Sequence, residues 1–436
     1  MFKNKSLVVF VLVFTLVFSV TLSGLAQDDV IELKFWHAMS GARLEPVNTL
    51  VDRFNESHPN INVDATFTGS YEETLNKAIT ASKGGNPPNI IQTYEVGTQM
   101  MWDSPYVVPI QDIAEPGEVD WGDFLNVVRR YYTNREGKLV SMPFNSSTAI
   151  LYYNKDKFEE AGLDPNSPPS TYEEVEEVGM QLVDSGVVRD AMTFGWPTWI
   201  FEQSHYWTDS LYVNNGNGRE ARATEVLFNR EPGMKIMKSW ADWEDEDILV
   251  YGGREYEPDS AFLSQQVAML AQSTSHAKDI VETAPFEVGT TFLPRPGWAD
   301  RGGTTIGGAS LYIFEDSQEK MDAAWEFVKF ISSTESAVYW HKQTGYFPIR
   351  YSALRKLMNE GWFADNPNFL TAFLQVLTAK RSPATSGAIV GRFPQIRDIV
   401  DEAVTSIFAD RKTVEEALNE AAKKANRVVE RYNESQ

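Results

Sequence analysis

The feature that most constrains the fold is an alternation of strand and helix patterns over residues 30–97. Apolar residues alternate along 30–37 and 61–67, and residues 89–93 form a third short strand pattern. Between these runs, apolar residues recur every three or four positions, which is typical of one face of a helix. Short connections between such elements place the strands parallel, with helices covering both faces of the sheet. The pattern therefore predicts an α/β fold, in which ligands bind beyond the carboxyl ends of the strands.

A second informative stretch is SMPFNSSTAILYYNK, residues 141–155, in which small polar residues separate two apolar runs. Residues 149–153 are typical of a strand that is buried on both faces. The hydroxyl groups of residues 146–148 would need partners in such a place, because buried polar groups without hydrogen bonds are costly. The stretch fits either a turn between two strands or a crossing between two lobes. We favour the crossing, because separate β/α patterns precede and follow it.

The length of the chain agrees with two domains. A chain of 436 residues is too long for a single hydrophobic core. No Pro-, Gly- or Ser-rich linker divides the sequence cleanly, which indicates that the chain passes between its lobes more than once.

The first 26 residues are typical of a signal peptide. Lys3 and Lys5 precede an apolar run over 7–22, and small residues stand at Gly24 and Ala26. We expect cleavage near Ala26, although an uncleaved membrane anchor is an alternative for the same pattern. The chain has no cysteine, which excludes disulfides, thiolate metal sites and a lipid-modified cysteine anchor. A periplasmic protein without a direct membrane anchor is the prediction.

The charge balance and the missing motifs restrict the function. A formal net charge of −22 disfavours nucleic acid and anionic membranes as partners. The five histidines share no metal-ligand spacing, and the usual hydrolase and nucleotide-binding motifs are absent. We therefore expect no enzyme, no catalytic residues, no metal and no cofactor. Because carboxylate pairs are abundant in so acidic a chain, a secreted hydrolase stays an alternative.

Arg397 is the best candidate for binding an anion. It lies in the first turn of a helix that Pro394 is expected to open, where backbone N–H groups and the helix dipole attract negative charge. Its guanidinium offers paired donors for a phosphate or carboxylate. The alternative is a surface arginine paired with Asp398 or Asp401.

Two further motifs have both a binding and a structural interpretation. Gly307 and Gly308 allow close approach of the backbone to a ligand, or they form a tight bend. Trp196 and Trp199 could stack on a sugar or on a choline-like cation, or they belong to the core.

Taken in order, GSYEETL, YEVGT, PFNSST, GGASL, TGYFPI and PQIR identify a resemblance. The sequence resembles the extracellular solute-binding proteins of ABC importers, in the large group that includes maltose-binding protein. Within that group the motifs look like the branch that binds sn-glycerol-3-phosphate. The resemblance extends over about residues 31–431.

The resemblance implies a two-lobed fold with the ligand held between the lobes, each a mostly parallel sheet flanked by helices. A signal peptide would occupy 1–26, and the first lobe would comprise 27–145 plus 306–346. The second lobe would comprise 146–305 plus 347–436.

The resemblance also implies roles for individual residues. Tyr71 and Glu95 would face the glycerol hydroxyls, and Trp196 would wall the site and serve a larger head group such as that of glycerophosphocholine. The residues expected around the phosphate are Ser147, Ser273, Gly308, Tyr346 and Arg397. Around Ser273 the sequence reads AQSTSHAKD, whereas the family usually has two serines followed by glycine.

The expected partners are a small-molecule phosphate ester and the transmembrane subunits of an ABC permease, with the protein acting as a monomer. An oligosaccharide-binding protein of the same fold is the main alternative.

Overall fold

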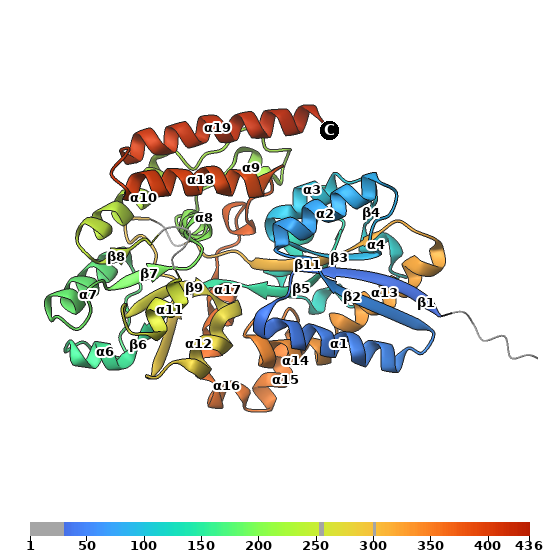
Figure 1. Cartoon of the computed structure of the whole chain (residues 1–436), viewed down its shortest axis with the longest axis horizontal. Helices are drawn as coiled ribbons and strands as arrows, with labels where there is room; N and C mark the ends of the chain where they lie inside the picture. The colour runs from blue at the N-terminus through green and yellow to red at the C-terminus, as the bar shows by residue number, and fades with distance from the viewer. Residues whose placement is uncertain (1–29, 253–256, 300–301) are drawn as a thin grey trace, which may run out of the picture.

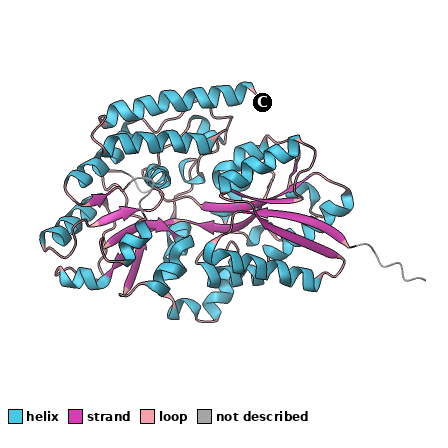
Figure 2. Ribbon diagram, in the orientation of Figure 1, coloured by secondary structure: helices cyan, strands magenta, loops and turns pink. Residues whose placement is uncertain are grey.

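The computed structural model describes residues 30–252, 257–299 and 302–436. Two β-sheets lie roughly end to end, and helices cover both of them (Figures 1 and 2). The predicted signal peptide, residues 1–26, lies outside the described residues. Within the described ranges, no helix is both long enough and apolar enough to cross a membrane.

The first sheet is mixed and has the strand order β2-β1-β3-β11-β4, with β5 also paired to β11. Strands β1, β2 and β3 are parallel, as the sequence predicts, whereas β11 runs antiparallel to β3, β4 and β5. The strands are β1 (Ile31–His37), β2 (Ile61–Phe67), β3 (Ile90–Tyr94), β4 (Val107–Val108), β5 (Met142–Ser147) and β11 (Gly307–Phe314).

The second sheet has the order β10-β6-β9-β7-β8. Strand β6 is antiparallel to both of its neighbours, and β7 is parallel to β8 and β9. The strands are β6 (Ala149–Asn154), β7 (Met192–Phe194), β8 (Leu249–Val250), β9 (Met269–Ser273) and β10 (Val288–Phe292). The α/β, two-lobed prediction with mostly parallel sheets is confirmed. In each sheet one strand, β11 in the first and β6 in the second, runs against the others.

The helices fall into three groups along the chain. Those before β5 are α1 (Leu44–Ser57), α2 (Tyr71–Lys83), α3 (Thr98–Trp102), α4 (Ile110–Ile113) and α5 (Asn126–Tyr132). Those between β6 and β10 are α6 (Lys155–Glu160), α7 (Tyr172–Asp184), α8 (Pro197–Trp207), α9 (Asn214–Gly218), α10 (Glu231–Asp245), α11 (Pro258–Leu263) and α12 (Ala277–Thr283). Those after β11 are α13 (Gln318–Ile331), α14 (Thr334–Thr344), α15 (Tyr351–Asn359), α16 (Trp362–Asp365), α17 (Thr371–Thr378), α18 (Phe393–Phe408) and α19 (Val414–Glu434).

Local sequence signals explain several of these boundaries. Capping boxes begin α2, α7 and α19, where a hydroxyl at Ser70, Thr171 or Thr413 accepts a backbone N–H and a glutamate three residues later bonds back. The apolar face predicted for α1 is buried as well.

The crossing interpretation of residues 141–155 is confirmed. Strand β5 belongs to the first sheet and β6 to the second, with only Thr148 between them. The buried hydroxyl of Thr148 donates to Thr304 at 3.0 Å and accepts from the Gln375 amide at 3.0 Å. The chain returns to the first sheet between β10 and β11, so it crosses more than once. The lobe boundaries given above stay a prediction.

Candidate functional site

Arg397 lies where α18 meets α8 and the turn that follows β3. Its Nε donates to Oε1 of Glu202 at 2.7 Å, and its Nη2 donates to Oε2 of Glu202 at 2.8 Å and to Oε1 of Glu95 at 2.7 Å. The helix α18 begins at Phe393, one residue before the predicted start at Pro394. Only 17% of the Arg397 side chain is exposed, so Arg397 forms a largely buried ion pair and is not a surface arginine.

Glu202 is a functional candidate that the sequence analysis did not identify. It is 2% exposed and is the one acid in the apolar helix PTWIFEQSHYW. Burial raises the pKa of Glu202, and the adjacent Arg397 guanidinium offsets part of that effect. Burial alone would lower the pKa of Arg397, but the carboxylates of Glu202 and Glu95 outweigh burial and raise the pKa well above its usual value. One cation thus stands between two carboxylates.

An aromatic pair occupies the adjoining part of the first sheet. The Tyr71 ring stacks on Tyr94 with centroids 5.3 Å apart, and its hydroxyl lies 3.5 Å from the hydroxyl of Tyr346. Asn145 donates to the Tyr71 hydroxyl at 2.8 Å and accepts from Gln92 at 2.8 Å. This chain of bonds fixes the orientation of Tyr71. Burial and the nearby Tyr346 raise the pKa of Tyr71, so the phenol stays protonated.

The sequence analysis identified Tyr71 and Tyr346 but not their supports. Asn145, Gln92 and Tyr94 fall within predicted strands or polar stretches, and nothing in their spacing connects them. Only the pairing of β3 and β5 with β11 brings them together.

Gly308 lies directly opposite Ser146 in the β5–β11 pair. Its φ is 94°, a conformation that favours glycine, and a Cβ at this position would overlap the carbonyl oxygen of Asn145. Close approach is therefore required here, and it is an approach to the neighbouring strand. The next pair joins Gly307 to Ser147, which is 3% exposed.

Ser273 and Ser147 come together at the crossing. Ser273 ends β9 and pairs in register with Ala149, two residues after Ser147. The next residue, Thr274, exchanges hydrogen bonds with Thr148 at 3.0 and 3.1 Å. The Ser273 hydroxyl accepts from the backbone N–H of Ser275 at 3.2 Å and caps the short turn that follows.

The two tryptophans in the first turns of α8 differ. Trp196 precedes the helix in a left-handed conformation with a φ of 62°, and 61% of its surface is exposed. Trp199 is 6% exposed and lies against Gly307. Trp199 is therefore a core residue, whereas Trp196 is free to meet a ligand.

The fold and this arrangement agree with a match to a known family. A family model described as bacterial extracellular solute-binding protein matches residues 49–371. The chain belongs to the bacterial extracellular solute-binding proteins. Proteins of this kind bind small-molecule ligands and work with ABC permease subunits.

Curated relatives match almost the whole chain. The sn-glycerol-3-phosphate-binding periplasmic protein UgpB of Pectobacterium atrosepticum is 34% identical over 414 residues, covering 93% of this chain and 92% of that protein. UgpB of Escherichia coli K12 is 34% identical over 427 residues, covering 96% of this chain and 97% of that protein.

Solved structures share the fold at lower identity. UgpB from Mycobacterium tuberculosis in complex with glycerophosphocholine has a TM-score of 0.79 and 21% identity, covering 92% of this chain and 98% of that one. The cyclic α-maltosyl-1,6-maltose-binding protein of Arthrobacter globiformis has a TM-score of 0.75 and 22% identity, covering 92% of this chain and 99% of that one.

Proposed function

We propose that this chain is the substrate-binding protein of an ABC importer for sn-glycerol-3-phosphate, glycerophosphodiesters such as glycerophosphocholine, or both. The relatives at 34% identity are named sn-glycerol-3-phosphate-binding proteins, and a UgpB structure of the same fold contains glycerophosphocholine. Proteins of the same fold include oligosaccharide binders, so the fold alone does not select the ligand. The observation that favours a phosphate ester is the covered Arg397 guanidinium, which bonds Glu95. The charge of Glu95 in turn acts on Tyr71 and contributes to its raised pKa.

The proposed ligand contacts follow from the chemistry of these groups. Within the described part of the chain, the bonds of Arg397 to carboxylates use Nε and Nη2, so Nη1 is the donor for a phosphate oxygen. Glu95 and Tyr71 bond the glycerol hydroxyls. The remaining phosphate contacts come from Ser147, Ser273, the backbone at Gly308, and Tyr346.

Trp196 serves a larger head group in this proposal. We propose that its indole, which is exposed at the start of α8, walls the site from the side of the second sheet. A quaternary ammonium such as choline is attracted to the face of a tryptophan ring. Trp196 is therefore expected to matter for glycerophosphocholine and little for glycerol-3-phosphate.

The proposed mechanism is closure of the two lobes around the ligand. Contacts from both sheets favour the closed state by the difference between the ligand's affinities for the closed and open states. The closed monomer then docks on the permease subunits. In this proposal the signal peptide is cleaved near Ala26, the protein acts in the periplasm, and the lobes are 27–145 plus 306–346 and 146–305 plus 347–436.

A titration followed by intrinsic tryptophan fluorescence tests the function. Glycerol-3-phosphate, glycerophosphocholine and maltose are titrated in parallel, and each mixture is assayed for hydrolysis. A saturable response to the phosphate esters without turnover is expected. A saturable response to maltose alone would overturn the proposal, and turnover of the diester would indicate a hydrolase.

A further inference from the structure

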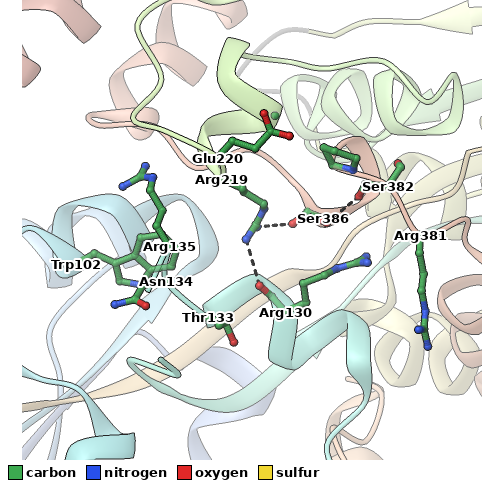
Figure 3. Close-up of a pocket in the computed structure, with 12 residues that line it drawn as sticks. Trp102, Arg130, Thr133, Asn134, Arg135, Arg219, Glu220, Arg381, Ser382 and Ser386 are labelled. Atoms are coloured by element: carbon green, nitrogen blue, oxygen red, sulfur yellow. Dashed lines mark hydrogen bonds between the residues drawn. The ribbon is translucent and has the colours of Figure 1, made fainter. Parts of the chain in front are cut away.

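A second positively charged region lies away from Arg397. Residues 366–397 contain no aspartate or glutamate, although the whole chain carries a net charge of −22. Four arginines, Arg130, Arg135, Arg219 and Arg381, line a pocket with a volume of about 450 Å³ (Figure 3). Four arginines at one place in so acidic a protein form a local concentration of positive charge.

The arginines come from segments that meet at the junction between the two sheets. Arg130 lies on α5, which packs against β5 of the first sheet, and Arg135 follows the same helix. Arg219 directly follows α9, and Arg381 lies in the loop after α17. Contacts already cross the junction here, since Nε of Arg135 donates to the Gly218 carbonyl at 2.9 Å.

The hydrogen bonds of the arginines leave their charge uncompensated. Arg219 donates to four backbone carbonyls and stacks over the Tyr131 ring; the carbonyls are those of Arg130 at 3.1 Å, Tyr131 at 3.3 Å, Gly387 at 2.8 Å, and Ser386 (Figure 3). Arg135 bonds the Gly218 carbonyl and the amide oxygen of Gln99. Among the described residues, Nε of Arg130 is buried without any partner.

Neighbouring acids do little to neutralise the cluster. Glu220 lines the pocket, but its carboxylate points away from the guanidinium of Arg219 in Figure 3. Asp103 is engaged in a two-pronged pair with Arg222 at 2.7 and 2.8 Å. Burial lowers the pKa of Arg219 to about 10, and the positive charges of Arg130 and Arg135 contribute to that shift. The cations therefore repel one another.

We propose that this pocket binds a phosphate-group anion, at a site separate from the solute site around Arg397. Guanidinium groups match the geometry of phosphate oxygens with paired donors, and an anion would compensate the repulsion among the four cations. The volume admits either inorganic phosphate or the phosphate end of an ester. Because Arg219 bonds the backbone carbonyl of Arg130 across the junction at 3.1 Å, a bound anion also stabilises the arrangement in which these two segments meet.

Tyr131 lies between the anion pocket and the solute site and contacts residues of both. Its ring lies 5.0 Å from the Arg219 guanidinium, and its hydroxyl donates to the Glu95 carbonyl at 3.4 Å. Glu95 in turn holds Arg397. The anion pocket therefore contacts the back of the solute site through one side chain, without sharing its arginine.

The test is calorimetric titration of the protein with inorganic phosphate at constant ionic strength. Arg381 is exposed, so Arg381→Gln removes a pocket charge with little risk to folding. Arg189→Gln is the matched control, because that side chain is 88% exposed and does not line the pocket. Phosphate affinity is expected to fall at least about tenfold in Arg381→Gln, further in Arg130→Gln/Arg381→Gln, and to stay unchanged in Arg189→Gln.

A second arm separates this pocket from the solute site and distinguishes the sources of phosphate. Wild-type protein loaded with one equivalent of glycerol-3-phosphate, and the variant Arg397→Met/Glu202→Gln, should both still bind inorganic phosphate. If the pocket takes esters, glycerol-3-phosphate itself should show a second, weaker equivalent that is lost in Arg381→Gln. The proposal is overturned if phosphate does not bind, if Arg381→Gln binds phosphate normally, or if only the Arg397 variant loses it. Phosphate binding that depends on Arg381 would stand even if glycerol-3-phosphate failed to bind.

Discussion

Removing the charge of Arg397 should both destabilise the protein and weaken its binding of the phosphate ester. In Arg397→Met, Glu202 loses two bonds at 2.7 and 2.8 Å, and Glu95 loses one at 2.7 Å. Both carboxylates are almost fully buried, at 2% and 6% exposure. Leaving a buried charge without its partner costs about 3–5 kcal/mol, so the free energy of unfolding should fall by about that amount near neutral pH.

The pH dependence of this loss identifies its cause. Burial already raises the pKa of Glu202, and without Arg397 nothing holds it down. A carboxylate whose folded pKa lies above its unfolded value costs stability above the folded pKa, and the cost disappears as the pH falls toward the unfolded value. The deficit of Arg397→Met should therefore shrink from pH ~7 to pH ~5.

The double variant Arg397→Met/Glu202→Gln separates stability from binding. It removes the stranded charge, so at least about half of the lost stability should return. Its affinity for glycerol-3-phosphate should stay at least about tenfold below that of the wild type, because a hydrogen bond to a charged group contributes roughly 1.5–3 kcal/mol. Urea unfolding followed by tryptophan fluorescence and calorimetric titration provide the two measurements. Wild-type stability in the single variant, or wild-type affinity in the double variant, would refute this reasoning.

Three further predictions concern other parts of the molecule. Burial lowers the pKa of His341 to about 4. Because its unfolded pKa is about 6.5, the unfolded state takes up the proton first, and the free energy of unfolding should fall by up to about 3 kcal/mol as the pH falls from 6.5 toward 4. Urea unfolding of His341→Gln should show a shallower dependence over that range. Gly308→Ala should destabilise the protein more than Gly117→Ala, since both glycines have positive φ but only at Gly308 would a Cβ overlap Asn145; equal unfolding midpoints would contradict this. Trp196→Ala should weaken glycerophosphocholine several-fold in a fluorescence titration and leave glycerol-3-phosphate unchanged, and an equal loss for both ligands would remove its role with the head group.

Much of the fold follows from local sequence signals. The periodicity of residues 30–97 predicts β1 to β3 and the two helices between them, because alternation and capping depend only on near neighbours. The crossing at Thr148 is also evident, since a buried strand directly follows a run of hydroxyls. The direction of the strand in the middle of the first sheet does not follow from local signals. Strand β11 enters between β3 and β4 from far along the chain, and no local pattern specifies an antiparallel partner.

The candidate site, like the fold, could be predicted from the sequence only in part. Arg397 is recognisable from its place at the start of a helix, but its partner Glu202 lies 195 residues away on a different helix. The arginine pocket is even less accessible to sequence reasoning, because its cations come from separate segments that meet only when the two sheets are in place. The roles of Ser147, Ser273 and Gly308 toward a ligand stay predictions.

The central claim is that Arg397 and its neighbours hold a glycerol phosphate ester between the two lobes. A crystal structure of the protein grown with sn-glycerol-3-phosphate tests it most directly. The account predicts a phosphate oxygen within hydrogen-bond distance of the Arg397 guanidinium, with the glycerol hydroxyls against Tyr71 and Glu95. A complex in which glycerol-3-phosphate occupies only the arginine pocket, with Arg397 still bound to Glu95 and Glu202 alone, would contradict it.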